Sequence, residues 1–185
     1  MKTNLTDYIQ VYNGSISEDL CNRTVSSLQN VKWELHTFYD AMNNTKSSHD
    51  NEPHSYYKKV DTTYELMDCL KKVISGYVSS YEFTHWNSWL GFSYPKFNRY
   101  VVGSEMTNHC DHIHSLFSGD VRGIPVLTMI GQLNKEYSGG ELVLLDKQYD
   151  LGVGDVLIFP SCFLYPHHVK KVTDGVRYSL ASWSW

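Results

Sequence analysis

The stretch PVLTMIGQLNKEYSGGELVLL, from Pro125 to Leu145, decides the fold class. It holds two runs rich in apolar and β-branched residues, VLTMIGQL and ELVLL, on either side of a polar connection that contains SGG. Runs of this length, bounded by glycine and polar residues, are typical of β-strands. The stretch therefore predicts two strands, with Gly139 and Gly140 serving only the turn between them.

The same pattern continues in both directions, from Trp86 to the end of the chain. Further strand-like runs are WLGFSY, RYVV, DVLIF and RYSLASW, and turn signals fall at Gly103, at 152–154 and at 174–175. Many short strands with no helix between them indicate a sandwich or barrel. We expect a double-stranded β-helix, a jelly-roll or cupin-like core, over residues 86–185. Side chains from distant strands of such a core can converge at its mouth.

The first part of the chain predicts helices. Ser15 with Glu18, and Thr62 with Glu65, form capping-box pairs ahead of two amphipathic runs. The second run places its apolar residues on one helical face, namely Leu66, Leu70, Val73, Ile74, Tyr77 and Val78. We therefore expect a mainly β protein with N-terminal helices, an α+β arrangement.

Two further segments of the N-terminal region have no helical pattern. Residues 33–39 alternate loosely like a strand, and residues 41–55 read AMNNTKSSHDNEPHS, with almost no apolar side chain. We expect 41–55 to be a solvated surface loop, with a lid over the site as the alternative. The chain is thus interpreted as a single domain, 1–185, in which a helical support region, 1–85, carries the core.

Bulk composition limits the function classes. With 185 residues, 42% of them hydrophobic, the chain can fill one core. A net charge of -4 gives no support for binding nucleic acid or an anionic membrane. The N-terminus MKTNLTDYIQ has no apolar signal region, and the four cysteines lack CxxC spacing. We expect a cytoplasmic protein with reduced thiols and no membrane partner, whose oligomeric state is open.

The motif NHCDHIH, residues 108–114, holds three histidines and an aspartate in seven residues. Because side chains alternate along an extended chain, His109 and Asp111 point to the same side and can share one ion. A histidine from the pair at 167–168 would complete two imidazoles and one carboxylate. This facial triad suits a non-haem Fe(II) oxygenase, since three coordination positions stay open. Zinc-dependent hydrolysis and a plain histidine-rich surface loop are the competing interpretations.

The order of motifs from Tyr100 to Trp183 resembles the 2-oxoglutarate and Fe(II)-dependent oxygenase superfamily, in particular its prolyl 4-hydroxylase-like branch. The motifs are RYVVGSEMTNHCD, VLTMIGQLNKEYSGGELVLL, GDVLIFPS and HHVKKVTDGVRYSLASW. Two positions depart from the family pattern: Lys171 replaces a proline, and Gln132 replaces an aromatic residue. The second change is expected to alter the wall of the cosubstrate pocket.

The resemblance implies which residues hold the iron. His109, Asp111 and His167 match the family's ligands. His167 is preferred over His168 because its distance of five residues to Val172 fits the family spacing. Asp111 also favours hydroxylation, since the related halogenases have a small residue at that position.

The resemblance also implies a cosubstrate site. Arg177 matches the basic residue that binds the C5 carboxylate of 2-oxoglutarate, and Tyr100 and Thr128 match hydroxyl donors to the same carboxylate. A guanidinium in the uncharged strand VRYSLASW needs an anionic partner in any case. Tyr100 as ordinary sheet packing and Thr128 as a hydroxyl bonded to backbone are the alternatives. Trp183 stands where nucleic-acid demethylases of the superfamily carry a second arginine, and is a candidate substrate contact.

The activity implied is a dioxygenase that hydroxylates its substrate while 2-oxoglutarate is decarboxylated to succinate. Fe(II), 2-oxoglutarate and O2 are the expected cofactor and cosubstrates, with ascorbate as a further candidate. A protein or peptide, hydroxylated at proline, is the first choice of substrate. The same chemistry on a free amino acid or other small molecule, and a non-catalytic cupin-like metal-binding module, are the alternatives.

Overall fold

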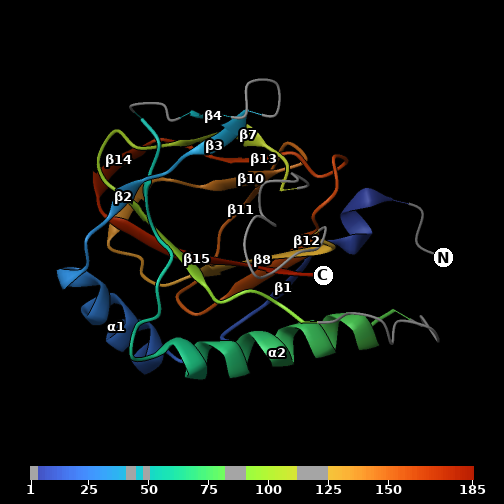
Figure 1. Ribbon diagram of the computed structural model, residues 1–185. Coiled ribbons are helices and arrows are strands. Elements are labelled where there is room, and N and C mark those ends of the chain that lie inside the picture. The colour runs from blue at the N-terminus through green and yellow to red at the C-terminus, as the bar shows by residue number, and fades with distance from the viewer. Residues whose placement is uncertain (1–3, 41–44, 48–50, 82–90, 112–124) are drawn as a thin grey trace.

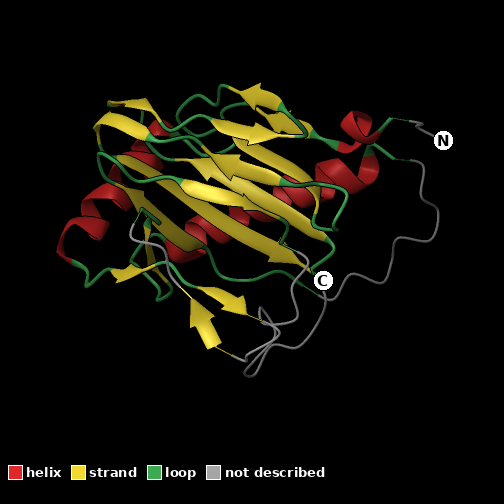
Figure 2. Cartoon of the chain, turned by 90° about the horizontal axis from the view of Figure 1, so that it is seen from above, coloured by secondary structure: helices red, strands yellow, loops and turns green. Residues whose placement is uncertain are grey.

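The computed structural model describes residues 4–40, 45–47, 51–81, 91–111 and 125–185. Its strands form two facing sheets, and the helices α1 (Glu18–Ser27) and α2 (Thr63–Ser79) lie against the outer face of the larger one (Figure 1). The turned view of Figure 2 shows α2 lying behind the strands and crossing their direction. The expected jelly-roll core with N-terminal helices is confirmed. Neither helix in the described ranges is both long enough and apolar enough to cross a bilayer.

Within the described residues the larger sheet has seven strands, all paired antiparallel. In spatial order they are β1 (Gln10–Tyr12), β12 (Val156–Pro160), β8 (Leu127–Gln132), β15 (Arg177–Ser184), β6 (Lys96–Tyr100), β5 (His54–Tyr56) and β2 (Glu34–Leu35). The smaller sheet has the order β11 (Lys147–Tyr149), β10 (Leu142–Leu144), β13 (His167–Val169) and β7 (Met106–His109). The pairs β14 (Val172–Gly175) with β9 (Tyr137–Gly139), and β3 (Phe38–Asp40) with β4 (Thr45–Ser47), form two-stranded sheets. Short 3-10 turns lie at Leu5–Tyr8 and Leu28–Asn30.

The two predicted helices are present, but their starts differ from the predicted capping boxes. Helix α1 is capped by Ser17, whose Oγ accepts from the Leu20 amide at 3.2 Å, whereas Ser15 Oγ bonds back to the Tyr12 carbonyl. At α2 the Thr62 side chain makes no cap bond, because its Oγ1 lies 2.7 Å from Thr24 Oγ1 and links the two helices. The cap of α1 is thus a local one moved to Ser17, whereas a tertiary contact replaces the cap at α2.

The N-terminal region contributes more than helices. Its strands β1, β5 and β2 occupy the two edges of the larger sheet. The first two residues of β5, His54 and Ser55, and the buried Pro53 before them belong to the segment 41–55 that was expected to be a solvated loop. Glu52 is also buried, with 2% of its surface exposed, and its Oε1 accepts from the Thr107 amide and hydroxyl.

Parts of this segment, residues 41–44 and 48–50, are outside the described residues. Residues 82–90, which contain the start of the predicted strand WLGFSY, are outside them as well. The lid alternative for 41–55 stays a prediction.

Side-chain alternation divides the interior into two parts. One apolar cluster joins α1 and α2 to the larger sheet, and a second fills the space between the sheets. On β6 the ring of Phe97 joins the helix side, whereas Lys96, Asn98 and Tyr100 line a cavity between the sheets. Three polar side chains on one interior face of a strand mark that cavity as the functional part of the core.

Candidate active site

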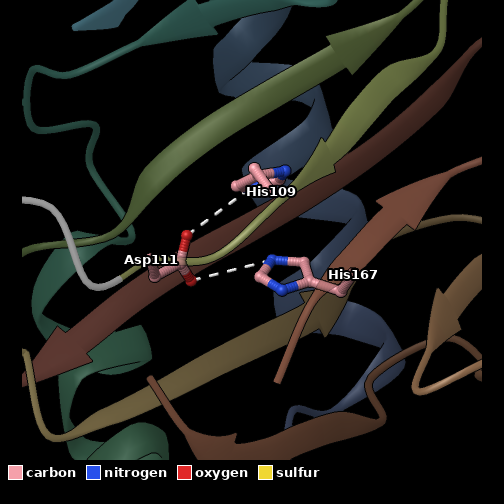
Figure 3. A group of neighbouring side chains, drawn as sticks. All are labelled: His109, Asp111 and His167. Atoms are coloured by element: carbon pink, nitrogen blue, oxygen red, sulfur yellow. Dashed lines mark ion pairs between the residues drawn. The ribbon is translucent and has the colours of Figure 1, made fainter. Parts of the chain in front are cut away.

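Three of the predicted ligands meet at one end of this cavity. His109 ends β7 and lies opposite His167, which begins β13, and Asp111 follows β7 by two residues. Asp111 Oδ1 is 3.5 Å from His109 Nε2, and Oδ2 is 3.7 Å from His167 Nε2 (Figure 3). The potential ligand atoms of all three residues lie within 4.8 Å of one another. His168 does not join them, because β13 turns it outward into a surface groove beside Val143.

Backbone carbonyls fix the two imidazole rings. His109 Nδ1 donates to the Thr107 carbonyl at 2.7 Å, and His167 Nδ1 to the Tyr165 carbonyl at 3.2 Å. A carbonyl can only accept, so each Nδ1 carries a proton, and in the neutral ring Nε2 then presents a lone pair toward Asp111. The neutral imidazole with a hydrogen-bonded second nitrogen is the usual form of a metal-ligating histidine.

Burial and charge keep these groups in their metal-binding forms. Burial lowers the pKa of His167 to about 4, against the opposing effect of the Asp111 carboxylate. Burial alone would raise the pKa of Asp111, but the His167 and His109 imidazoles outweigh it and lower the value. At pH 7 the buried His167 imidazole is therefore neutral, and the Asp111 carboxylate that faces it is ionised. Such a donor set fits a divalent cation such as Fe(II).

Thr128 lies at the metal end of the cavity, and not beside Arg177 as predicted. Its Oγ1 donates to Asp111 Oδ2 at 2.8 Å and lies 2.8 Å from Ser161 Oγ. In the register of the larger sheet Thr128 faces Trp183, six residues beyond Arg177 on β15 and about 20 Å away along the strand. The structure therefore places Thr128 away from the predicted carboxylate site, and its hydroxyl instead holds Asp111, one of the three metal-ligand candidates.

The variant Thr128→Val is expected to weaken divalent-metal binding by about 10-fold to 100-fold, because it removes the donor that holds Asp111 and preserves the side-chain shape. Anaerobic titration with Co(II), followed by its visible absorption, measures the effect. The control is Thr173→Val on the exposed face of β14. Equal metal affinity of Thr128→Val and the parent protein would contradict an orienting role.

Arg177 and Tyr100 lie together toward the other end of the cavity. They face each other across β15 and β6, and the guanidinium carbon is 4.9 Å from the Tyr100 ring centroid. Arg177 is 2% exposed, its Nη1 donates to Ser179 Oγ at 3.2 Å, and its Nε has no partner within the described residues. No described carboxylate lies within 4.0 Å of its nitrogens. A buried cation with an orphaned donor fits the carboxylate of a small ligand.

The structure adds detail to three residues of this region that the sequence analysis discussed. Burial raises the pKa of Tyr100 to about 12, so its hydroxyl stays a donor. A Cβ on Gly140, whose φ is +68°, would lie 2.9 Å from Val172 Cγ2 and 3.1 Å from Arg177 Cδ. Gly140 therefore makes room for the arginine as well as forming the turn. Gln132 is held by its Nε2, which donates to the Asn134 and Tyr178 carbonyls.

Trp183 and two unpredicted side chains complete the cavity wall. Trp183 lines the cavity, and its Nε1 is buried without a hydrogen-bond partner in the described part of the chain. Lys96 and Asn98 were missed, although the alternation of polar residues in KFNRY could have indicated them. The cavity thus connects the three metal-ligand candidates with two buried cations, Lys96 and Arg177.

Comparison with known families agrees with this arrangement. Residues 95–185 match the family described as the 2OG-Fe(II) oxygenase superfamily. A PKHD-type hydroxylase of Delftia acidovorans is 34% identical over 97 residues, which cover 49% of this chain and 42% of the relative. A PKHD-type hydroxylase of Shewanella oneidensis is 37% identical over 100 residues, covering 51% and 43%. The chain therefore spans less than half the length of these relatives.

Solved structures share the fold over nearly the whole chain. A prolyl hydroxylase of Trichoplax adhaerens, in complex with a hypoxia inducible factor peptide fragment, has a TM-score of 0.72 at 17% identity and covers 97% of this chain and 84% of its own. A Pseudomonas putida prolyl-4-hydroxylase has a TM-score of 0.68 at 15% identity, with coverages of 96% and 91%. The viral collagen prolyl hydroxylase of Paramecium Bursaria Chlorella virus-1 has a TM-score of 0.65 at 16% identity, with 98% of both chains covered. These likenesses concern the fold and include the N-terminal region that the family match leaves out.

Proposed function

Residues 95–185 belong to the 2OG-Fe(II) oxygenase superfamily, and from this premise we propose that the chain is a 2-oxoglutarate-dependent Fe(II) dioxygenase that hydroxylates a protein or peptide substrate, with proline as the first choice. The observation that carries the proposal is the pairing of two sites in one cavity. His109, Asp111 and His167 form a donor set that fits a cation, and no carboxylate of the described residues lies within 4.0 Å of the buried guanidinium of Arg177. The donor set fits Fe(II), and the arginine fits a carboxylate of 2-oxoglutarate.

The residues have separate tasks in this proposal. His109, Asp111 and His167 would hold Fe(II), with Thr128 orienting Asp111. Arg177 and Tyr100 would bind the far carboxylate of 2-oxoglutarate. Bound iron would activate O2, the oxidant of the reaction, so that one oxygen atom enters the substrate hydroxyl and the other enters succinate as 2-oxoglutarate loses carbon dioxide. The chain contributes alignment and the exclusion of water, and the burial of Asp111, His167 and Arg177 supports that task.

The preference for a protein or peptide substrate rests on weaker support. The names of the structural neighbours are those of prolyl hydroxylases, one of them crystallised with a peptide fragment. The net charge of -4 and Trp183 in the cavity wall, where demethylases of nucleic acids carry an arginine, disfavour a nucleic acid. A free amino acid or other small molecule remains the second candidate. A non-catalytic metal-binding module would leave the buried Arg177 unexplained.

The test of the proposal is mass spectrometry of reaction mixtures with Fe(II), 2-oxoglutarate and ascorbate. Proline-containing peptides are expected to gain one oxygen with matching formation of succinate, whereas methylated oligonucleotides are expected to stay unchanged. The matched control is His167→Ala under the same conditions. Tight binding of 2-oxoglutarate without succinate formation on any peptide or amino acid would favour the non-catalytic module.

A further inference from the structure

Lys96 places a second cation in the cavity, apart from Arg177. It begins β6 and pairs with Ala181 of β15, four residues beyond Arg177 toward Trp183. It is 8% exposed and lines the same cavity as the three metal-ligand candidates. A lysine this deeply buried is rare unless its charge is compensated.

No carboxylate of the described residues compensates this charge at close range. Asp111 and Glu52 act on Lys96 electrostatically, but neither has an oxygen within 4.0 Å of its Nζ. Asp111 also faces the two histidines, and Glu52 Oε1 accepts from the Thr107 amide and hydroxyl. Both carboxylates therefore have other roles.

The single described polar contact of Lys96 is with a neutral group. Its Nζ lies 3.4 Å from His36 Nδ1. The same nitrogen lies 3.3 Å from Ser55 Oγ, which donates its proton to Asn98 Oδ1 at 2.9 Å, so His36 Nδ1 either donates to the serine or accepts from the lysine. Burial lowers the pKa of His36 to about 2, and the imidazole is therefore neutral at pH 7. An ammonium has three N–H groups, and this contact uses at most one of them.

The ammonium lies near two aromatic rings, one in the cavity wall and one at the surface. Its Nζ is 5.6 Å from the ring centroid of Trp183, which lines the cavity, and 5.8 Å from that of Tyr57, which is 55% exposed. Lys96 therefore connects the cavity of the metal-ligand candidates with an exposed aromatic side chain.

We propose that Lys96 determines substrate specificity by binding a carboxylate of the substrate, so that preferred substrates carry a negative charge near the carbon that is hydroxylated. The inference rests on the proposed function and narrows its substrate class. A free amino acid, or a peptide with an acidic side chain or terminal carboxylate next to the target residue, meets this requirement. The aromatic rings of Trp183 and Tyr57 would flank the bound group.

The first test asks whether an anion site exists. Crystals of the protein with redox-inert Mn(II) and 2-oxoglutarate are soaked in sodium bromide, and the anomalous signal locates the halide. A bromide ion beside Lys96 Nζ is expected in the parent protein and is expected to be absent in Lys96→Met. Absence of bromide at Lys96 in the parent, or a carboxylate of 2-oxoglutarate bound there, would overturn the proposal.

The second test compares ligands that carry either a carboxylate or the corresponding amide. The pairs are L-proline with L-prolinamide, and capped Pro–Asp with capped Pro–Asn peptides, and Mn(II) broadening of their proton resonances reports binding near the metal. The parent protein is expected to bind the member with the carboxylate about 10-fold or more tightly than the amide. Lys96→Met is expected to lose this preference, and Lys96→Arg to retain part of it. Equal binding of both members by the parent protein would also overturn the proposal.

Two controls separate the possible failures. Lys147→Met removes an exposed lysine on β11 and is expected to keep the preference. The Lys96→Met protein is expected to unfold at the same or a higher temperature, because an apolar chain replaces a buried ammonium that has no ion-pair partner. If Lys96→Met weakens 2-oxoglutarate as much as the anionic ligands, Lys96 serves the cosubstrate. Failure of the parent protein to bind 2-oxoglutarate at all would contradict the proposed function itself.

Discussion

Replacing Asp111 or His167 with alanine is expected to abolish Fe(II) binding and turnover and to leave the fold intact. Each variant removes one of three ligands from a donor set whose atoms lie within 4.8 Å of one another. The loss of metal affinity should exceed about 100-fold, since removing a side chain that merely orients a ligand already lowers affinity by about 10-fold to 100-fold. Anaerobic metal titration measures the affinity, and circular dichroism reports the fold.

The matched control is His168→Ala, next to one of the ligands. In β13 the alternation of side chains turns His168 away from Asp111 and into a surface groove. This variant is therefore expected to bind metal like the parent protein. An inactive His168→Ala protein together with an active His167→Ala protein would mean that the register of β13 is displaced by one residue.

The sequence predicted the strands that coincide with long apolar runs. Strands β8 and β15 have six and eight residues, almost all of them buried, which is long enough for such a run to be recognised. Strands β2 and β5 have two and three residues, too few to show a period, and polar side chains dominate the segment that contains β5. Their place at the edge of the larger sheet depends on the pairing of β5 with β6 and of β2 with β5. No local sequence pattern indicates such pairing.

In the site, too, the sequence predicted what depends on neighbouring residues and not what depends on the pairing of distant strands. His109 and Asp111 are two residues apart, and their common direction follows from the geometry of an extended chain. Thr128 and Arg177 come from different strands, and their separation follows from the register of β8 against β15. The order of motifs along the chain does not contain that register. This is why the motif match assigned Thr128 to the wrong end of the cavity.

Replacing Arg177 with alanine is expected to weaken 2-oxoglutarate binding by about 30-fold or more. Truncating one partner of a buried, charge-assisted pair costs about 2 to 5 kcal/mol. The measurement is anaerobic titration of the Fe(II)-loaded protein with 2-oxoglutarate, followed by the visible charge-transfer band of the complex. Arg177→Lys is expected to retain part of the affinity, because an ammonium keeps the charge and loses the planar fork.

Iron binding should survive in Arg177→Ala, because the arginine is not among the three grouped metal-ligand candidates. A suitable control is Arg99→Ala on β6, whose side chain does not line the cavity and whose neighbours across the sheet are Tyr178 and His54. It is expected to bind 2-oxoglutarate like the parent protein. If Arg177→Ala also titrates like the parent, the orphaned Nε of this buried guanidinium serves another ligand. That result would leave the proposed metal site unaffected. It would remove the main structural argument for 2-oxoglutarate as the cosubstrate, which is the buried Arg177.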